Sequence, residues 1–400
     1  MGLSAVRSEL GVAPAAPAST IGIADFARAV FAGEELRKDW DSLMARAGGA
    51  SPDPGAMLDL STLLQLTGQR EPGLALQSDA LDRQRWYRRV VGSGRGPRLL
   101  VLAAAGDLMA NTPVEFLLGG WSGALDTLYL RPGEPPPVEI PDHDVAMLGV
   151  GESDASASIL EALAPRLAAW PRPILNGAPG AISALAREPA ARRLASLPGV
   201  SAPATRRLSA AELASARGFP IIARPVDSHA GAGLEKLSSA AEAAGYLRRV
   251  SAPAYYAQPF IDYRGSDGRF RKLRIALVGG APFLVHMAIS DHWMVHYLNA
   301  GMREDADKRA EEAAMFESFE KGFAARHAAA LAGVAAALGL NYVALDCAED
   351  RDGRLLVFEA DTAMIVHDMD PPEVFPYKAP AMRRLFGAFQ ALVNARAGVR

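Results

Sequence analysis

The sequence is short of cysteine, of long apolar runs and of any excess of one charge. Among its 400 residues Cys347 is the single cysteine, which excludes an intrachain disulfide framework and a cysteine-rich zinc site. No apolar run approaches the ~18 residues needed to cross a bilayer, and the N-terminal segment lacks a run of signal-peptide length. With 42 lysines and arginines against 45 acidic residues, the net charge of −3 gives no general attraction for nucleic acid. We therefore expect a cytoplasmic protein that binds neither membranes nor nucleic acid.

What is present suits a folded protein of two or three domains, because half of the residues are hydrophobic and 22% are charged. Residues 23–47 and 58–91 carry apolar residues at helical spacing. Part of the second stretch, LDLSTLLQLTGQREPGLALQSDAL, resembles one tetratricopeptide-like helix–turn–helix unit, which cannot bury its own apolar face. We predict a helical N-terminal extension over 1–95 that packs on the rest of the chain or binds a protein partner.

Strands alternate with helices in the next segment. Short apolar runs at 99–105, 127–132 and 144–151 predict buried strands, and the spacing predicts helices over 156–170 and 182–197. This alternation is typical of a parallel α/β domain, which we place at 96–202.

From residue 203 the pattern changes to strands around turns. A strand (FPIIARPV) precedes a glycine-bearing loop and a helix over 238–250, and further strands follow. A long helix over 311–338 then leads to YVALDCAEDRDGRLLVFEAD, which has the signature of a β-hairpin. We therefore expect an α+β region over 203–400.

The hairpin carries the strongest chemical signal. With Asp352-Gly353 as a two-residue turn, Asp346 lies opposite Glu359, and strand alternation puts Asp361 on the same face. Like charges at such positions destabilise a sheet unless something neutralises them, and Mg²⁺ with oxygen ligands is the economical candidate. The alternative is a solvent-exposed face of an edge hairpin.

Two basic segments could hold anions. Arg224 ends a strand before the small-residue loop that contains Gly231 and Gly233, so backbone amides and a guanidinium could meet phosphate oxygens there. Arg274 belongs to RFRKLRIALV, where it clusters with Arg271 and Lys272, and these three residues could hold phosphates or a carboxylate. An ordinary glycine loop and a charged edge strand are the respective alternatives.

The histidines give a weaker signal. His292 and His296 stand four residues apart and share a face if that stretch is helical, which would suit a transition metal. We instead expect His229 or His292 to contact the substrate. A structural role is the alternative for each histidine. His286 and His367 also fall near the motifs. Alternation points Cys347 away from the acidic face, as a core residue.

Taken in order, these motifs resemble the ATP-grasp superfamily, especially the RimK-like and glutathione-synthetase-like carboxylate–amine ligases. The resemblance covers roughly residues 97–380. It implies ATP held between two α+β subdomains, 203–260 with the glycine loop and 261–400 with the metal site, after a Rossmann-like α/β domain.

The resemblance also assigns the metal side of the site. Asp346, Glu359 and Asp361 match the acidic triplet that binds two Mg²⁺, although asparagine is usual at the last position. Arg274 matches the arginine of a DxR motif that faces the γ-phosphate or acyl phosphate, and Lys272 replaces the acid of that motif.

On the nucleotide side, Arg224 matches a phosphate-binding lysine, and the loop with His229, Gly231 and Gly233 matches the flexible glycine loop. Arg193, with Arg192 as a close alternative, matches the basic residue of the preceding helix.

The hinge that reads adenine matches AQPFID at Gln258, Phe260 and Ile261, and Asp267 or Asp262 matches a ribose ligand.

The implied activity is ATP- and Mg²⁺-dependent, ADP-forming ligation of a small-molecule or peptide carboxylate to an amine through an acyl phosphate. Two alternatives stay open: a non-catalytic nucleotide-binding scaffold or sensor with a helical interaction module, and a kinase of the same fold. The identities of both substrates and the oligomeric state stay open as well, although dimers are usual in this superfamily.

Overall fold

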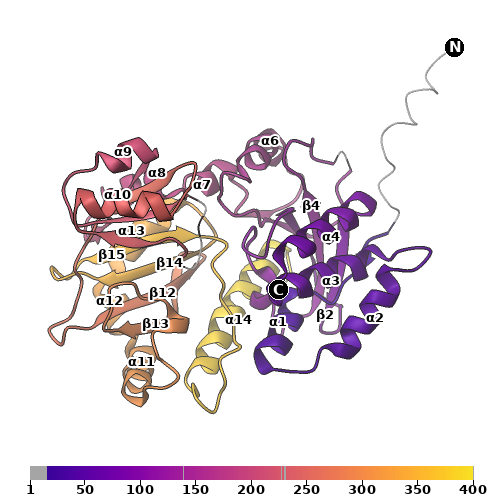
Figure 1. Cartoon of the computed structure of the whole chain (residues 1–400). Helices are drawn as coiled ribbons and strands as arrows, with labels where there is room; N and C mark the ends of the chain where they lie inside the picture. Colours follow the sequence, from indigo (N-terminus) through magenta and orange to yellow (C-terminus); the bar gives the residue numbers. More distant parts are fainter. Residues whose placement is uncertain (1–15, 138, 227, 229–230, 400) are drawn as a thin grey trace.

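The computed structural model describes residues 16–137, 139–226, 228 and 231–399. In this part of the chain the strands form three sheets, of six, four and five strands. Figure 1 shows the six-stranded sheet and the N-terminal helices on one side of the molecule, the two smaller sheets on the other, and a long C-terminal helix between them. Each described helix is too short or too polar to span a bilayer.

The six-stranded sheet has the order β1-β2-β4-β3-β5-β6, and its pairs are parallel except for β2 with β4. The strands are β1 (Ala18–Ser19), β2 (Trp86–Val91), β3 (Arg98–Ala104), β4 (Gly123–Leu130), β5 (Val145–Leu148) and β6 (Ile174–Leu175). Residues 99–104 of β3 are all buried, because a central parallel strand is covered on both faces.

The N-terminal residues are part of this same sheet. They form α1 (Ile23–Ala32), α2 (Arg37–Ala47), α3 (Pro54–Leu66) and α4 (Arg70–Arg83), and then β2. The helical spacing over 23–47 belongs to two helices, because Gly33 takes a left-handed φ of 70° and ends α1. The helix expected to run to residue 91 is wrong for its last six residues, since aromatic and β-branched residues pair there with β4.

The helix pair α3–α4 packs on the rest of the chain. Met57, Leu58 and Leu81 form a buried cluster with Tyr87 of β2, and Tyr129 of β4 packs against them. Of the two roles expected for this pair, docking on the chain is the one observed. The boundary expected at residue 95 falls between β2 and β3, which belong to one sheet.

The α/β domain is completed by α5 (Val114–Leu117), α6 (Ala157–Ala168), α7 (Pro179–Ser183) and α8 (Arg187–Leu194). The helix expected over 182–197 is therefore two helices, with a break at 184–186.

The glycine-loop subdomain contains the four-stranded antiparallel sheet, ordered β10-β9-β11-β8. Its elements are β8 (Arg206–Leu208), α9 (Ala210–Ala214), β9 (Ile221–Pro225), β10 (Glu235–Leu237), α10 (Ala240–Arg249) and β11 (Tyr255–Pro259). It has its own apolar core, in which Tyr246 and Tyr255 are fully buried.

The five-stranded sheet of the C-terminal subdomain has the order β13-β12-β14-β15-β7. Its strands are β7 (Val200–Ser201), β12 (Phe270–Val278), β13 (Ala281–Ser290), β14 (Tyr342–Glu349) and β15 (Leu355–Asp361). Its helices are η1 (Tyr297–Asn299), α11 (Ala306–Ser318), α12 (Phe323–Arg326), α13 (Ala328–Leu338) and α14 (Lys378–Arg396). The long helix expected over 311–338 is broken around Gly322 into α11, α12 and α13.

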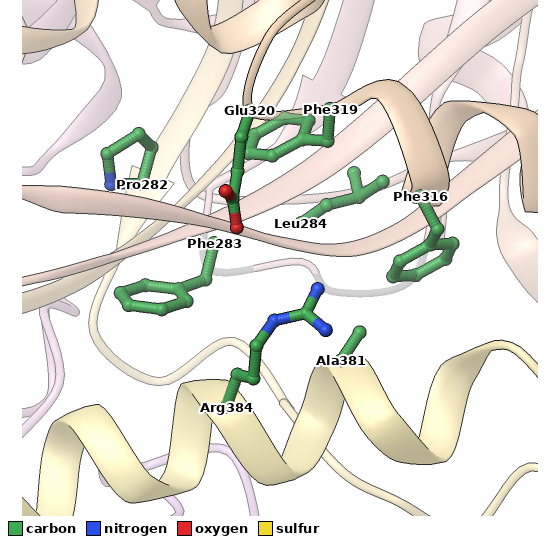
Figure 2. A pocket seen from close by; sticks show the side chains of 8 residues that line it. All are labelled: Pro282, Phe283, Leu284, Phe316, Phe319, Glu320, Ala381 and Arg384. Carbon is green, nitrogen blue, oxygen red and sulfur yellow. The ribbon is translucent and has the colours of Figure 1, made fainter.

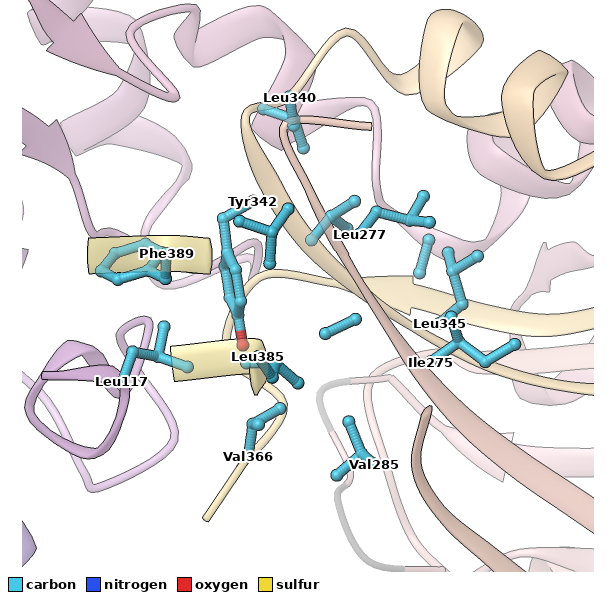
Figure 3. Close-up of a cluster of buried hydrophobic side chains, with 14 of the residues drawn as sticks. Leu117, Ile275, Leu277, Val285, Leu340, Tyr342, Leu345, Val366, Leu385 and Phe389 are labelled. Carbon is cyan, nitrogen blue, oxygen red and sulfur yellow. The ribbon is translucent and has the colours of Figure 1, made fainter. Parts of the chain in front are cut away.

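Helix α14 joins this sheet to the α/β domain. Figure 3 shows Tyr342 of β14 facing Phe389 and Leu385 of α14, with Leu117 of α5 beside them. The Tyr342 and Phe389 rings meet edge to face at 5.6 Å. Gln390 donates from α14 to the backbone carbonyls of Leu117, which ends α5, and of Gly119, which fixes the helix on the α/β domain. The expected fold class, an α/β domain followed by two α+β subdomains, is confirmed at this level.

Candidate active site

The β14–β15 hairpin places Asp346 directly opposite Glu359, as predicted. The route differs from the prediction, because the loop holds three residues, 351–353, and Gly353 at φ 74° closes it. Phe358 then has no partner on β14: it is an extra residue between the pairs Cys347–Val357 and Asp346–Glu359, which makes a β-bulge. The longer loop shifts the register by one residue and the bulge shifts it back, so the carboxylate pair is confirmed although the two-residue turn is wrong.

Asp346 is neutralised by the neighbouring strand β12. Arg274 lies opposite it in the register and donates to both carboxylate oxygens at 2.8 and 3.2 Å. Lys272 donates to Oδ2 at 2.9 Å. Burial alone would raise the pKa of Asp346, but the two cations outweigh it and hold the pKa well below its usual range. The like-charge repulsion that predicted a metal ion is thus relieved at this position by protein cations.

Glu359 is paired with Arg187, the first residue of α8, which packs on β15. Burial raises the pKa of Glu359, but Arg187 and then Arg224 outweigh it, so the net pKa is lowered. Arg193 and Arg192 were the expected basic residues of this helix, and both are exposed. Six residues are about one and two-thirds turns, which puts Arg193 on another face than Arg187. The structure therefore brings Arg187, which the sequence did not single out, to the hairpin.

Arg224 is placed by the middle of the four-stranded sheet. It lies near the end of β9, is half-buried, and donates to Ser228 Oγ at 2.9 Å. Burial, and then the charge of Arg187, lower the pKa of Arg224 to about 10. Two arginines that repel each other beside one carboxylate form a site that an additional anion would stabilise.

Both glycines that the sequence singled out in the loop have a left-handed backbone. Gly231 and Gly233 take φ of 78° and 64°, a conformation that favours glycine. A Cβ on Gly231 would meet the Met294 sulfur at 3.6 Å, so Gly231 lies against the segment after β13. His229 lies outside the described residues.

The hinge residues form an aromatic and polar corner after β11. The Lys236 ammonium stands 3.8 Å from the centre of the Phe260 ring, and Trp293 meets that ring edge to face at 6.0 Å. Gln258 accepts a hydrogen bond from Thr205 at 2.8 Å. Ile261 is half-buried against the main core. Lys236 and Trp293 were not predicted, because they come from other elements than the hinge.

The two ribose candidates are held elsewhere. Asp267 lies in an exposed turn and pairs with Arg271 at 2.6 Å, which lowers its pKa. Asp262 pairs with Arg264 and Arg351 at 2.7 and 3.0 Å. The structure therefore does not bring either carboxylate to the hairpin cluster.

The residues fit a divalent cation only in part. Within the described ranges, no group of three or more histidine, cysteine, aspartate or glutamate side chains has the geometry of a metal site. Asp346 has both oxygens engaged by cations, whereas Glu359 Oε2 and Asp361 Oδ2 receive no hydrogen bond from the described residues. Burial, and then Glu359, raise the pKa of Asp361 to about 7. Glu359 and Asp361 therefore offer two oxygen donors whose negative charges disfavour each other. Such a pair suits one hard cation better than the two Mg²⁺ ions that were expected.

Of the histidines near the motifs, His286 lies on β13, and His292 and His296 lie on the irregular segment after it. His286 is opposite Arg274 in the β12–β13 register, and its ring packs against Tyr297 with the two ring centres 4.6 Å apart. Burial, and then Arg274 and Lys378, lower the pKa of His286 well below its usual value. His292 and His296 do not share a helix, since residues 291–296 are irregular, so the condition for their sharing a face is not met.

A buried polar network adjoins this cluster. Glu312 of α11 is fully buried and accepts hydrogen bonds from Tyr297 and Tyr377 at 3.0 and 2.7 Å. Lys378 of α14 donates to Asp370 at 3.0 Å and to the Tyr297 hydroxyl. No spacing in the sequence could have revealed this network, because its members come from separate elements.

A separate groove runs between β13, α11 and α14, lined by apolar residues together with Glu317, Glu320 and Arg384. Figure 2 shows Arg384 of α14 and Glu320 after α11 reaching toward the same space, with Phe283 and Phe316 beside them. None of the basic residues at the hairpin lines this groove.

No protein-family model matches the chain, and no curated protein matches it in sequence. Solved structures are similar in three dimensions. A RimK domain ATP-grasp protein from Sphaerobacter thermophilus has 19% identity and a TM-score of 0.40, over 74% of this chain and 99% of that chain. The VanG D-Ala:D-Ser ligase from Enterococcus faecalis has 12% identity and a TM-score of 0.43, over 74% and 100%. The D-alanine-D-alanine ligase from Coxiella burnetii has 9% identity and a TM-score of 0.45, over 75% and 96%.

Proposed function

We propose that this chain is an ATP-dependent, ADP-forming carboxylate–amine ligase of the ATP-grasp type. The observation that carries the proposal is the convergence of four cations on one face of the hairpin from three separate elements. They are Arg187 of α8, Arg224 of β9, and Lys272 and Arg274 of β12. They exceed the three carboxylates of that face by one charge, which suits a polyanion such as a nucleoside triphosphate.

The phosphates would lie between Arg187 and Arg224. Both guanidiniums are half-buried, so their hydrogen bonds to phosphate oxygens would be only weakly screened by solvent. The base would pack in the corner of Phe260, with backbone groups of 258–261 at its edge. Asp267 could bind the ribose only if its ion pair with Arg271 were broken.

The chemistry requires positioning and charge neutralisation but no protein nucleophile. A substrate carboxylate oxygen attacks the γ-phosphorus, the bond to the bridging oxygen breaks, and ADP leaves. An amine then attacks the acyl carbon, loses a proton and displaces inorganic phosphate, which leaves an amide. Arg274 and Lys272 would neutralise the transferring phosphoryl group.

Glu359 and Asp361 would hold a magnesium ion in this enzyme. When bound, the ion supplies a fixed positive charge for phosphate oxygens and removes the penalty on ionised Asp361.

A second function, non-catalytic nucleotide binding, is favoured by one observation. Asp346 has both oxygens in ion pairs with Lys272 and Arg274, so it is less available to a metal than the family pattern implies. The two functions share the phosphate site and differ in turnover.

Titration calorimetry with ATP, with and without Mg²⁺, tests the shared site. Arg224→Gln is compared with Arg217→Gln, an exposed arginine of the same subdomain. A charged hydrogen bond is worth roughly 1.5–3 kcal/mol, so the first variant should bind ATP at least about tenfold more weakly, and the second should bind normally. No binding by the wild type, or equal binding by both variants, contradicts the proposal.

An assay of ADP release with pooled carboxylates and amines then separates the functions. Release that needs both substrates supports the ligase, and release with one acceptor that keeps the phosphate supports a kinase. ATP binding without any release supports the non-catalytic alternative.

A further inference from the structure

Helix α1 contacts a loop of the C-terminal subdomain that leads directly out of the candidate site. This loop, 362–370, follows Asp361 at the end of β15. Arg28 of α1 donates through Nε and Nη2 to Asp368 Oδ1 at 3.2 and 3.0 Å. Met369 packs against the cluster of Ala24 and its neighbours on α1 and α5. The loop is therefore held from outside by an N-terminal helix.

The same loop is held from inside by Arg274 of the site and by Lys378 of α14. Arg274 Nη1 donates to the Ile365 carbonyl at 3.1 Å, in addition to its pair with Asp346. Lys378 donates to Asp370 at 3.0 Å. Val366 between them is fully buried, so the loop has little freedom to move without disturbing these bonds. The position of Ile365 thus helps to set the orientation of the Arg274 guanidinium.

Helix α1 has a rigid footing on the α/β domain. Asp59 of α3 accepts hydrogen bonds from the backbone amides of Ile21 and Gly22 at 2.8 and 3.1 Å. Glu115 of α5 accepts one from Ala24 at 3.1 Å. Carboxylates at a helix N-terminus satisfy amides that have no partner within the helix. The start of α1 is therefore fixed to the domain from which it reaches the loop.

We propose that α1 positions the phosphate-facing Arg274 through the 362–370 loop, so that turnover depends on the Arg28–Asp368 ion pair. Arg28 is a positioning residue and touches no substrate. The inference rests on the proposed function for its catalytic readout, because Arg274 acts there on the transferring phosphoryl group while Arg187 and Arg224 bind the nucleotide. Helix α1 then contributes to catalysis by positioning Arg274, without contacting the substrate.

The test compares Arg28→Ala, Asp368→Ala, the double variant and the exchanged pair Arg28→Asp/Asp368→Arg. Arg37→Ala is the matched control, because it removes an exposed i,i+4 partner of Asp41 on α2. Arg28 also lies 3.6 Å from Asp25, which the Asp368 variant leaves intact. Each protein is measured for ATP affinity by calorimetry and for kcat of ADP release.

We expect kcat to fall about fivefold in each single variant, equivalent to about 1 kcal/mol, with ATP affinity within about twofold of wild type. The double variant should be no slower than the slower single one, and the exchanged pair should recover at least half of the loss. The control should match the wild type. Unchanged kcat in Arg28→Ala, additive losses in the double variant, or an equal loss of ATP affinity would overturn the positioning role.

Hydrogen exchange of the loop separates this inference from the proposed function. The amides of Ala363 and Met369 donate to Asp361 and His367 within the loop at 2.8 and 3.2 Å. Their exchange should accelerate in Arg28→Ala and Asp368→Ala but not in Arg37→Ala. If the wild type releases no ADP, the proposed function fails, and unchanged exchange in the loop would still overturn the positioning by α1.

Discussion

Arg187→Ala, set against Arg193→Ala on the same helix, is the sharpest test of the site. Both substitutions remove one positive charge from α8, but only Arg187 contacts Glu359, while Arg193 is exposed. The net charge and the helix are therefore matched, and any difference between the two variants reports the contact itself.

The magnitude follows from the burial of the pair. Truncating one partner of a fully buried ion pair costs about 3–5 kcal/mol, and exposed pairs are worth about 0–1 kcal/mol. The side chains of Arg187 and Glu359 are 19% and 29% exposed, which places them between these limits. We expect Arg187→Ala to lower the free energy of unfolding by roughly 1–3 kcal/mol, and Arg193→Ala to change it by less than about 0.5 kcal/mol.

Nucleotide binding provides the second readout. A charged hydrogen bond to phosphate is worth about 1.5–3 kcal/mol, so Arg187→Ala should weaken ATP binding by roughly 10- to 150-fold. Urea denaturation and titration calorimetry measure the two effects on the same samples. Equal ATP affinities for the two variants would refute the placement of phosphates at Arg187, even if the stabilities differ.

Two further expectations concern buried carboxylates. Burial raises the pKa of Asp59 from 3.8 to about 7, so its folded form holds the proton more tightly than the unfolded form, and stability falls as pH rises from about 4 to 7. In urea denaturation across that range, the free energy of unfolding of the wild type should decline. Asp59→Asn should reduce that decline by at most about 4 kcal/mol. Parallel curves of unfolding free energy against pH for the two proteins would contradict this expectation. Asp346→Asn leaves Lys272 and Arg274 without their counter-ion and should cost about 3–5 kcal/mol in the same experiment, whereas the exposed Asp267→Asn should cost under about 1 kcal/mol. Equal losses for these two variants would show that the Asp346 cluster is not a buried ion network.

The sequence by itself determined the local parts of this protein. Alternation and turn chemistry act over a few residues, so they predicted the β14–β15 hairpin and the Asp346–Glu359 pair. The pair survived a wrong turn length because the β-bulge restored the register, which burial of the opposite face of the hairpin favours.

Only the tertiary structure decided which charges meet. Arg187 and Arg193 look alike in sequence, and the packing of α8 on β15 selects the first. Residues Trp86–Val91 suit a helix or a strand, and pairing with β4 decides for the strand. The carboxylates of the hairpin could have been neutralised by a metal or by basic residues, and the register of β12 brings Lys272 and Arg274 to Asp346. These outcomes depend on contacts between elements far apart in the chain, which short-range patterns do not encode.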